Sequence, residues 1–526
     1  MTQDQTNSLI EYGARRYIIT ITVVLCTLLE LIDTTVVNVA TNTLMGNLGA
    51  TISEVSWVIA AYAIANVIVV PMSGWLSSFF GRKYYFAGSV AIFTFASLMC
   101  GLSGSIWTLV FWRFIQGIGG GALFSTSQTI LKEIYPPEKI GMAMAMFGMG
   151  VIVGPTIGPY LGGYLVYNYS WPVIFYVNIP IGIIAVFLTL TYIRDNPFEK
   201  RQEAGVDWLG IFLLIVGIGS LQLVLEQGER NDWFESQYIL TFTLLAIGGI
   251  VGFIIRELTA ENPIVDLRVL TKGNVAIGTF MNFILGFILF GSVFIYPIYM
   301  QRFLGFTAQM SGAMFIPGAL LSGMMMPMIG GMLSKGMPPK FMIVVGFLVT
   351  ATFVFWSSMI FTTNTGTEVM FWPLIIRGFG MAFLFVPLSG LTLGGLVGKD
   401  VGQASGISNM IRQIGGSISV AVIGVLNETL SAEHRANLLN NITPDNVMLS
   451  DRLNAMKAGL MNTTADAEKA AQQALALLDF NINKQAAILS YIDIFHYMTV
   501  FILISVPLVL FAKTYKLNKD AMNDAH

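Results

Sequence analysis

Charged residues are scarce in this sequence. Of its 526 residues, 11% are charged and 55% are hydrophobic, whereas a soluble globular chain carries about 25% charged residues. Apolar stretches of about 20 residues, the length that crosses a bilayer as a helix, recur from end to end. A transmembrane β-barrel would alternate polar and apolar residues, and these stretches do not. The composition therefore argues against a soluble protein and predicts an all-α membrane protein.

Cysteine and histidine are also rare, with two cysteines and three histidines. Cys26 and Cys100 lie inside apolar stretches, so we interpret them as small buried side chains rather than a disulfide or a metal site. No phosphate-binding loop, dinucleotide loop, metal cluster or catalytic nucleophile can be identified. The sequence therefore predicts no enzyme, no metal, no cofactor and no nucleic-acid partner. Energy for transport would come from an ion gradient.

Fourteen membrane spans are predicted from the apolar stretches. They lie near 17–44, 55–77, 84–104, 107–131, 141–165, 172–193, 207–227, 237–256, 274–299, 308–333, 341–361, 370–397, 403–429 and 491–513. An even number of spans places both termini on one side. The short loops on that side hold most of the 28 lysines and arginines, and the opposite short loops hold only Arg230 and Arg302. Basic loops stay inside, so both termini are expected in the cytoplasm and the chain in the inner membrane.

An internal echo predicts two related halves. Trp107, Arg113 and "GIGGGALF" are repeated as Trp372, Arg377 and "GFGMAFLF", and such repeats are typical of transporters. We expect six-helix bundles at 17–200 and 273–514, with two inserted helices and a cytoplasmic linker at 201–272. The second bundle would contain a long periplasmic loop at 430–490, with tails at 1–16 and 515–526. That loop is polar and rich in helix formers, so we expect either a solvated helical loop or a docking surface.

Ionisable residues inside the first span are candidates for function, because they are costly in the membrane. Glu30, Asp33, Thr34, Val37 and Asn38 share one helical face. Glu30 lies 13 residues, or roughly 20 Å, from the inner end of the span, which is near mid-membrane. Two carboxylates one turn apart do not both ionise cheaply in a low dielectric. We therefore expect proton exchange here, the alternative being a permanently paired structural acid.

Arginines lie inside two other spans. Arg113 shares a face with Gln116 and three glycines, and it needs an anionic partner, for which Asp33 and Glu30 are at compatible depth. The alternative is a purely structural ion pair. Arg412 shares a face with Asn409 and Gln413 in the thirteenth span, toward its cytoplasmic end. The polar residues expected to line a substrate cavity are Asn38, Gln116, Gln128, Arg377, Asn409, Arg412 and Gln413.

Seven motifs are spread over nearly the whole chain. They are "LLELIDTTVVNVA" (28–40), "GWLSSFFGRKYYF" (74–86), "RFIQGIGGGAL" (113–123), "GVIVGPTIGPYLGG" (150–163), "WPVIFYVNIPIG" (171–182), "DWFESQ" (232–237) and "NPIVDLRVL" (262–270). Together they resemble the fourteen-span drug:proton antiporters of the major facilitator superfamily, and within that family the EmrB branch.

The resemblance implies two six-helix bundles that rock about a central cavity and export hydrophobic toxic compounds in exchange for protons. Its EmrB branch implies the inner-membrane part of a tripartite system, with a periplasmic adaptor and an outer-membrane channel as partners. The long outer loop would be a candidate adaptor contact.

The same resemblance implies roles for individual residues. Asp33 would be the proton-linked acid, Arg113 its partner and Glu30 a second membrane acid. The cytoplasmic gate motif would comprise Gly74, Gly81, Arg82 and Lys83. A hinge-like antiporter motif would comprise Gly150, Gly154, Pro155, Gly158, Pro159, Gly162 and Gly163.

One position departs from the family pattern. The loop motif usually carries an acid where this chain has Ser78, so the charge relay of the gate is altered. Three other readings stay open at this point: proton- or ion-coupled uptake of a solute, a transport-inactive scaffold or sensor on the same fold, and a channel. The absence of a ring of like charges counts against a channel.

Overall fold

The protein is built from helices. The structure, a computed structural model, describes residues 9–195, 205–396, 398–440, 442–443, 446–464 and 466–512, and these ranges contain no strand. A backbone in lipid must satisfy its own hydrogen bonds, which long helices do. The predicted C-terminal tail, the first eight residues of the N-terminal tail, and residues 196–204 at the predicted boundary between the first bundle and the linker lie outside the described residues.

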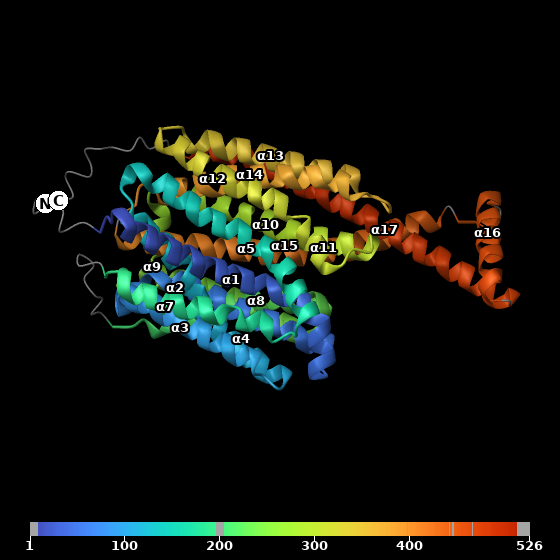
Figure 1. Cartoon of the computed structure of the whole chain (residues 1–526), viewed down its shortest axis with the longest axis horizontal. Coiled ribbons are helices and arrows are strands. Elements are labelled where there is room, and N and C mark those ends of the chain that lie inside the picture. The colour runs from blue at the N-terminus through green and yellow to red at the C-terminus, as the bar shows by residue number, and fades with distance from the viewer. Residues whose placement is uncertain are drawn as a thin grey trace, which may run out of the picture.

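Six spans form the N-terminal half of the bundle (Figure 1), and the sixth is divided into α6 and α7. They are α1 (Gly13–Leu48), α2 (Ile52–Phe80), α3 (Arg82–Gly101), α4 (Ile106–Ile134), α5 (Ile140–Asn168), α6 (Val173–Tyr176) and α7 (Asn178–Tyr192). Local signals set some of the ends. Thr51 and Glu54 form a capping box at the start of α2, and Ser105 caps α4.

The inserted pair and the C-terminal half follow. The pair is α8 (Trp208–Gln227) and α9 (Gln237–Thr259). The half consists of α10 (Val275–Phe303), α11 (Ala308–Ala313), α12 (Ile316–Ser334), α13 (Pro339–Ile360), α14 (Thr367–Leu393), α15 (Lys399–Leu439), α16 (Val447–Thr464) and α17 (Ala467–Ser505). Short 3-10 helices are η2 (Pro137–Lys139), η3 (Glu229–Asn231), η4 (Trp233–Glu235), η5 (Leu267–Thr271) and η6 (Val506–Phe511).

The fourteen predicted spans are confirmed, although one of them is unusual. Among the described residues, 13 helices are long and apolar enough to cross a membrane. The fourteenth, predicted at 107–131, is α4, which has 29 residues but a more polar sequence. Residues 119–132 of α4 are all buried. This part of α4 faces other helices rather than lipid, so it tolerates glycine, hydroxyl and amide side chains.

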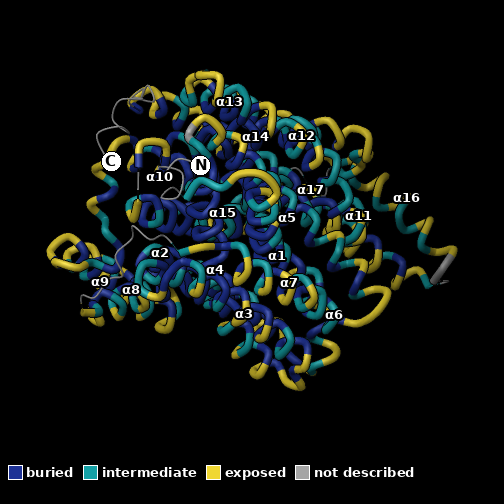
Figure 2. The backbone as a smooth tube through the Cα atoms, turned by 60° about the vertical axis from the view of Figure 1, so that its left-hand side comes forward, coloured by how far each residue is buried: buried dark blue, intermediate teal, exposed yellow. Residues whose placement is uncertain are grey.

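The two halves pack their spans in the same order. In the first half α1 packs on α5 and α7, and α4 packs on α2 and α3. In the second half α10 packs on α15 and α17, and α14 packs on α12 and α13. The halves meet where α2 contacts α15 and where α5 contacts α12. Figure 2 shows the buried residues along α1, α4, α5 and α15 in the middle of the molecule. The internal echo predicts such a pair of related halves, and this arrangement agrees with the fold that the resemblance to the major facilitator superfamily implies.

The inserted helices lie at the side of the junction between the halves. Helix α8 packs on α2 and α15, and α9 packs mainly on α8. Gln222 of α8 donates to Ser417 of α15 (2.8 Å), and Gln227 donates to Ser56 of α2 (3.2 Å). Helix α9 leaves apolar side chains such as Leu244 and Ile247 exposed, as a helix in contact with lipid does. Of the two inserted helices, α8 therefore makes most of the contacts with both halves.

Most described residues of the predicted loop at 430–490 are helical, and this segment projects beyond the bundle (Figure 1). Helix α15 continues to Leu439, ten residues past the predicted end of the thirteenth span, and α17 starts at Ala467, before the predicted last span. Arg435 pairs with Asp479 (2.8 Å), and His434 contacts Asp493 (2.8 Å). Hydropathy marks where a helix leaves the membrane, not where it ends, so these two helices extend beyond the predicted spans.

A pair of glycines tests the close contact between α8 and α9. A Cβ on Gly249 would come within 2.5 Å of the Gly217 backbone, whereas a Cβ on the neighbouring Gly248 would meet nothing within 4 Å. We expect Gly249→Ala to lower the midpoint of thermal unfolding in detergent, because overpacking costs about 1–3 kcal/mol. Gly248→Ala should leave the midpoint unchanged or raise it slightly, since alanine favours helix. Equal effects of the two would contradict this packing.

Candidate functional site

Asp33 of α1 and Arg113 of α4 meet in the middle of the N-terminal half. Their exposed fractions are 0% and 1%, and Nη1 of Arg113 donates to Oδ2 of Asp33. Oδ1 of Asp33 accepts hydrogen bonds from Nε2 of Gln116 (2.9 Å) and Nδ2 of Asn178 (2.9 Å). A buried ion pair is tolerated only when its remaining hydrogen-bonding capacity is met. Both oxygens of this carboxylate have partners.

Arg113 connects three helices. Besides Asp33, it donates through Nη1 to Oε1 of Gln116 (2.9 Å) and through Nε to the carbonyl of Val58 in α2 (3.3 Å). Its guanidinium carbon lies 4.2 Å from the centroid of the Tyr62 ring, a distance at which a cation is attracted to an aromatic face. Of the two acids considered as partners of Arg113, Asp33 is therefore the one in contact.

Asn178, the first residue of α7, was not singled out by the sequence. It donates both to Asp33 and to Oγ of Ser97 (3.0 Å). The only sequence signal was an asparagine within an apolar span, in the motif at 171–182. Its position beside Asp33 depends on the packing of α7 against α1 and α3, which the sequence does not reveal.

Glu30 lies one turn from Asp33 but faces the other half of the molecule. It is 1% exposed, its Oε1 accepts from Nδ2 of Asn66 (3.2 Å), and its Oε2 has no hydrogen-bond partner among the described residues. Oδ1 of Asn66 in turn accepts from Nε2 of Gln413 in α15 (2.8 Å). Glu30 is thus the less satisfied of the two acids, and it connects to the interface between the halves.

Arg412 of α15 is a basic residue on the same side of the site as Glu30. It is buried, its guanidinium carbon lies 4.0 Å from the centroid of the Phe124 ring, and its charge acts on Glu30. Nε of Arg412 has no hydrogen-bond partner among the described residues. Because Arg412 is buried beside Phe124, its side chain does not extend to the membrane surface. The site therefore contains a cation from each half.

The C-terminal half repeats the arginine of α4 without its acid. Arg377 of α14 donates through Nε to Oγ of Ser292 in α10 (3.1 Å) and lies 5.2 Å from the centroid of the Phe315 ring. Helix α10 packs in the second half as α1 does in the first, so Ser292 stands where the first half has Asp33. Among the described residues, this carboxylate–guanidinium pair in the first half therefore has no counterpart at Arg377 in the second half.

A polar pocket lies between α4, α10, α14 and α15. Three of the residues predicted to line a substrate cavity line it, namely Gln128, Asn409 and Arg412. Asn409 donates to Oε1 of Gln128 (3.2 Å) across the interface between the halves. The other predicted cavity residues lie elsewhere. Gln116 belongs to the Asp33 network, Gln413 contacts Asn66, Arg377 is enclosed in its own half, and Asn38 is exposed on α1.

The predicted gate motif lies where α2 turns into α3. Gly74 faces Gly402 of α15, and a Cβ on Gly74 would lie 2.9 Å from the Gly402 carbonyl carbon. Gly81 has a φ of +87°, which favours glycine. Arg82 forms an ion pair with Glu133 of α4, and the backbone N–H of Lys83 donates to Oδ1 of Asp195 (2.8 Å).

Glu133 and Asp195 were not predicted as parts of this gate. The hydroxyl of Ser78, at the position of the usual acid, donates to the carbonyl of Gly74 (3.1 Å). The carboxylates around Arg82 and Lys83 therefore come from α4 and from the end of the sixth span. Both acids are more than 50 residues along the chain from Arg82, so the loop motif alone does not indicate them.

The predicted antiporter motif is a glycine stripe on α5. Gly150, Gly154, Gly158 and Gly162 recur every four residues and face α1, and a Cβ on Gly158 would lie 2.0 Å from Oγ1 of Thr35. Gly163 faces Gln309 of α11, in the other half. Pro155 and Pro159 lie within the helix, where each removes a backbone hydrogen bond. Helix α5 thus packs closely on both halves while lacking two of its internal bonds.

The two arginines provide a matched test of the ion pair. Arg113→Gln leaves the Asp33 carboxylate buried without its cation, which typically costs about 3–5 kcal/mol. Arg377→Gln removes no partner of a carboxylate, so we expect a smaller fall in the unfolding midpoint, measured in detergent at neutral pH. Adding Asp33→Asn to Arg113→Gln should recover much of the loss. Equal losses in the two single variants would argue against an ionised Asp33.

Comparisons with known proteins agree with this geometry. Residues 23–420 match the family model of the Major Facilitator Superfamily. The chain is 35% identical to the multidrug export protein EmrB of Escherichia coli K12, over 95% of this chain and 96% of that protein. It is 32% identical to the fatty acid resistance protein FarB of Neisseria gonorrhoeae, over 95% and 97% of the two chains. It is 29% identical to the colistin resistance protein EmrB of Acinetobacter baumannii, over 92% and 93%.

Solved structures share the fold at low identity. The proton:xylose symporter XylE superposes with a TM-score of 0.61 at 15% identity, covering 96% of this chain and 97% of that one. The human organic anion transporter MFSD10 superposes with a TM-score of 0.59 at 14% identity, covering 95% and 100%. The fold, the family model and the relatives all lead to one conclusion: this chain is a multi-pass membrane transporter that belongs to the Major Facilitator Superfamily.

Proposed function

We propose that this protein exports hydrophobic toxic compounds from the cell in exchange for protons. The observation that carries the proposal is the buried Asp33–Arg113 pair with a second, less satisfied acid, Glu30, one turn away at the interface between the halves. Relatives whose names denote multidrug export support the direction of transport. A carboxylate in the membrane that gains and loses a proton couples a proton gradient to movement.

In this proposal the charge of Asp33 decides how strongly α1, α2 and α4 are held together. Arg113 reaches all three helices, and protonation of Asp33 removes the charge that holds the guanidinium. Glu30, one turn from this pair, is connected to the second half by hydrogen bonds, since Asn66 donates to Glu30 and accepts from Gln413. A substrate that displaces a proton from Glu30 would then compete with protons, as antiport requires.

Rocking of the halves must break contacts that lie at the end of the bundle where α1 begins. Nζ of Lys132 donates to the carbonyls of Leu393 and Leu396 (2.7 Å for Leu396), and Nε2 of Gln128 donates to Oγ of Ser389 (3.3 Å). Gln128 and Lys132 lie one turn apart on α4. We propose that this end is cytoplasmic and that these contacts hold it closed when the cavity faces outward.

We further propose that the protein works with a periplasmic adaptor and an outer-membrane channel. The helical segment around α16 extends from the end of the bundle opposite to the start of α1 (Figure 1). Several of its apolar side chains are exposed, including Met448 and Phe480. Exposed apolar surface outside the membrane is typical of a protein interface, so this segment is the proposed adaptor contact.

The exchange of substrate for protons can be measured directly in proteoliposomes. A pH-sensitive dye inside reports an imposed gradient while hydrophobic cationic and neutral compounds are added in turn. We expect substrate-dependent collapse of the gradient with the unchanged protein and none with Asp33→Asn. Asp479→Asn, an exposed acid in the projecting segment, is the control and should behave as the unchanged protein.

Two results of that measurement would count against the proposal. Coupled flux that persists in a folded Asp33→Asn variant would remove Asp33 from the mechanism. Protons and compound moving in the same direction would identify uptake instead of export.

The adaptor contact is tested by shortening the projecting segment. Replacing residues 441–466 by a short glycine–serine linker removes α16 but keeps the contacts of His434 with Asp493 and Arg435 with Asp479. We expect transport in proteoliposomes to be unchanged and resistance of whole cells to fall to the level of cells without the transporter. Loss of both activities would assign the segment to folding instead.

A further inference from the structure

A row of polar side chains runs from Glu30 to the inserted helix α8. Nδ2 of Asn66 in α2 donates to Oε1 of Glu30 (3.2 Å), and Oδ1 of Asn66 accepts from Nε2 of Gln413 in α15 (2.8 Å). Ser417 lies one turn further along α15. Its Oγ accepts from Nε2 of Gln222 in α8 (2.8 Å). The row therefore joins a buried acid of α1 to one of the two inserted helices.

The row ends on a second acid, Glu226. Its Oε1 accepts from Nε2 of Gln222 (2.9 Å), one turn back on α8. Glu226 is half-buried, and it forms no ion pair among the described residues. An ionisable side chain within a span is costly and is therefore a candidate for function. The polar row thus has a carboxylate at each end and consists of Glu30, Asn66, Gln413, Ser417, Gln222 and Glu226.

The two ends of the polar row lie at different depths. Gln227, next to Glu226, donates to Ser56 near the start of α2 (3.2 Å), and α2 starts at the end of the bundle opposite to the start of α1. Asn66 comes 14 residues after the first residue of α2, which is about 21 Å along the helix. In the orientation proposed above, the row leads from the outer end of the bundle to mid-membrane.

The polar row is partly open to water. Gln413, Ser417 and Glu226 are half-buried, whereas Gln222 is 4% exposed and the two innermost members are 1% and 3% exposed. A charge is costly in an apolar medium, so a proton crosses a membrane protein where polar side chains or water can hold it. The row provides such groups on the way to an acid that water does not reach directly.

Charges beside Glu226 come from η3. Arg230 acts on Glu226 electrostatically, but its Nη1 donates to the carbonyl of Ile52 instead (2.8 Å). The carboxylate of Glu229 lies against Gly424 of α15. Glu226 thus has a cation in its surroundings without being held in an ion pair by it. This suits a carboxylate that both takes up and releases a proton.

The charged residues of the other helices packed on α8 lie elsewhere. Helix α2 has one acid, Glu54, in its exposed capping box. Helix α9 has Arg256 and Glu257, both in its last turn, at the opposite end from η4. Helix α15 has Arg412, which acts on the inner end of the row, and the exposed Glu428 further out. The surroundings of the outer acid are therefore set mainly by η3.

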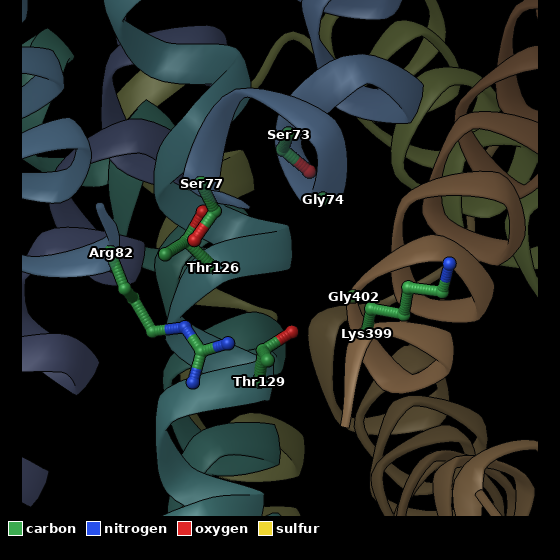
Figure 3. A pocket seen from close by; sticks show the side chains of 8 residues that line it. All are labelled: Ser73, Gly74, Ser77, Arg82, Thr126, Thr129, Lys399 and Gly402. Carbon is green, nitrogen blue, oxygen red and sulfur yellow. The ribbon is translucent and has the colours of Figure 1, made fainter. Parts of the chain in front are cut away.

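The opposite end of the junction between α2 and α15 has a different lining. A small pocket there, next to the gate motif, is lined by hydroxyl side chains, glycines, Arg82 and Lys399, and by no acid. Figure 3 shows Arg82 on one side of this pocket and Lys399 on the other. The acid that contacts Arg82 is Glu133, which is paired with it. The junction therefore offers a carboxylate outside an ion pair at its outer end and basic side chains at its inner end.

We propose that Glu226 takes up protons from the outer medium and that the polar row passes them to Glu30. This rests on the proposed function and adds the route by which the proton arrives. A proton on Glu226 would pass to water held among Gln222, Ser417 and Gln413, and from there to Glu30, whose Oε2 has no partner among the described residues. Glu226 is then ionised again and takes up the next proton. The inserted helices would thereby take part in transport.

Two modes of transport in proteoliposomes separate this route from other roles of Glu226. The labelled hydrophobic compounds of the panel above are moved either by an imposed pH gradient or by exchange for unlabelled compound without a gradient. Only the first mode needs a net supply of protons. We expect Glu226→Gln to slow gradient-driven transport about tenfold at neutral pH and to leave exchange unchanged. A positioned proton-transfer group contributes about 10²–10⁴-fold to its own step, and that step is one of several in the cycle.

The conservative variant and the pH provide a readout that a structural role would not move. Glu226→Asp keeps a carboxylate and should retain most of the gradient-driven rate. Lowering the pH on the side from which protons enter should bring Glu226→Gln closer to the unchanged protein, because protons from bulk water then reach the row without the acid.

Two further variants test the row itself. Gln222→Leu interrupts the row while Glu226 stays in place, and it should slow the gradient-driven mode alone. Glu235→Gln changes an exposed acid of η4 at the same end of the bundle. It is the matched control and should behave as the unchanged protein in both modes.

Each contrary result has a distinct meaning. Equal gradient-driven rates in Glu226→Gln and the unchanged protein would overturn the route and leave the proposed antiport in place. Loss of exchange together with gradient-driven transport would assign Glu226 to the packing of α8. If the unchanged protein shows neither mode with any compound of the panel, the proposed function fails and the route fails with it.

Discussion

A charge inside a membrane protein must find its partners within the protein, and the Asp33–Arg113 pair shows how much structure this requires. The hydrogen bonds of this pair involve side chains or carbonyls from α1, α2, α4 and α7. Those helices must pack closely for the contacts to form, which is why α4 has glycines where it faces α2 and α3. The same enclosure lets α4 be polar along its length. The ion pair and the fold of the N-terminal half therefore depend on each other.

The two halves share a packing order but not a chemistry. Each places an arginine on equivalent helices beside an aromatic ring, yet in the part of the chain that the structure describes Arg113 pairs with an acid and Arg377 does not. The second half contributes amides, hydroxyls and Arg412 to the interface. The halves are therefore alike in helix packing and different in their polar side chains. The first half holds the two acids Glu30 and Asp33, and the second half contributes amides and Arg412 to the surface that faces them.

The sequence predicted well what depends on local composition. The positions of the spans, the all-helical class and the depth at which Asp33 could meet Arg113 follow from hydropathy and helical geometry. It did not predict contacts that require knowledge of packing, such as Asn178 beside Asp33, Glu133 beside Arg82 or Asn66 between Glu30 and Gln413. Asn38, which is exposed on α1, and Arg377, which is enclosed in its own half, remain predictions as cavity residues. Their polarity is visible in the sequence, but the direction of their side chains is not.

The length of two helices has a mechanical consequence. Helices α15 and α17 contain 41 and 39 residues, and each runs without interruption from inside the bundle into the projecting segment. Neither contains proline. Such a helix is about 60 Å long, and a tilt of about 10° moves the far end of a rod of that length by about 10 Å. Any rocking of the C-terminal half would therefore displace the outer end of the projecting segment. A protein seated on the tip would sense which way the cavity faces without contacting the substrate.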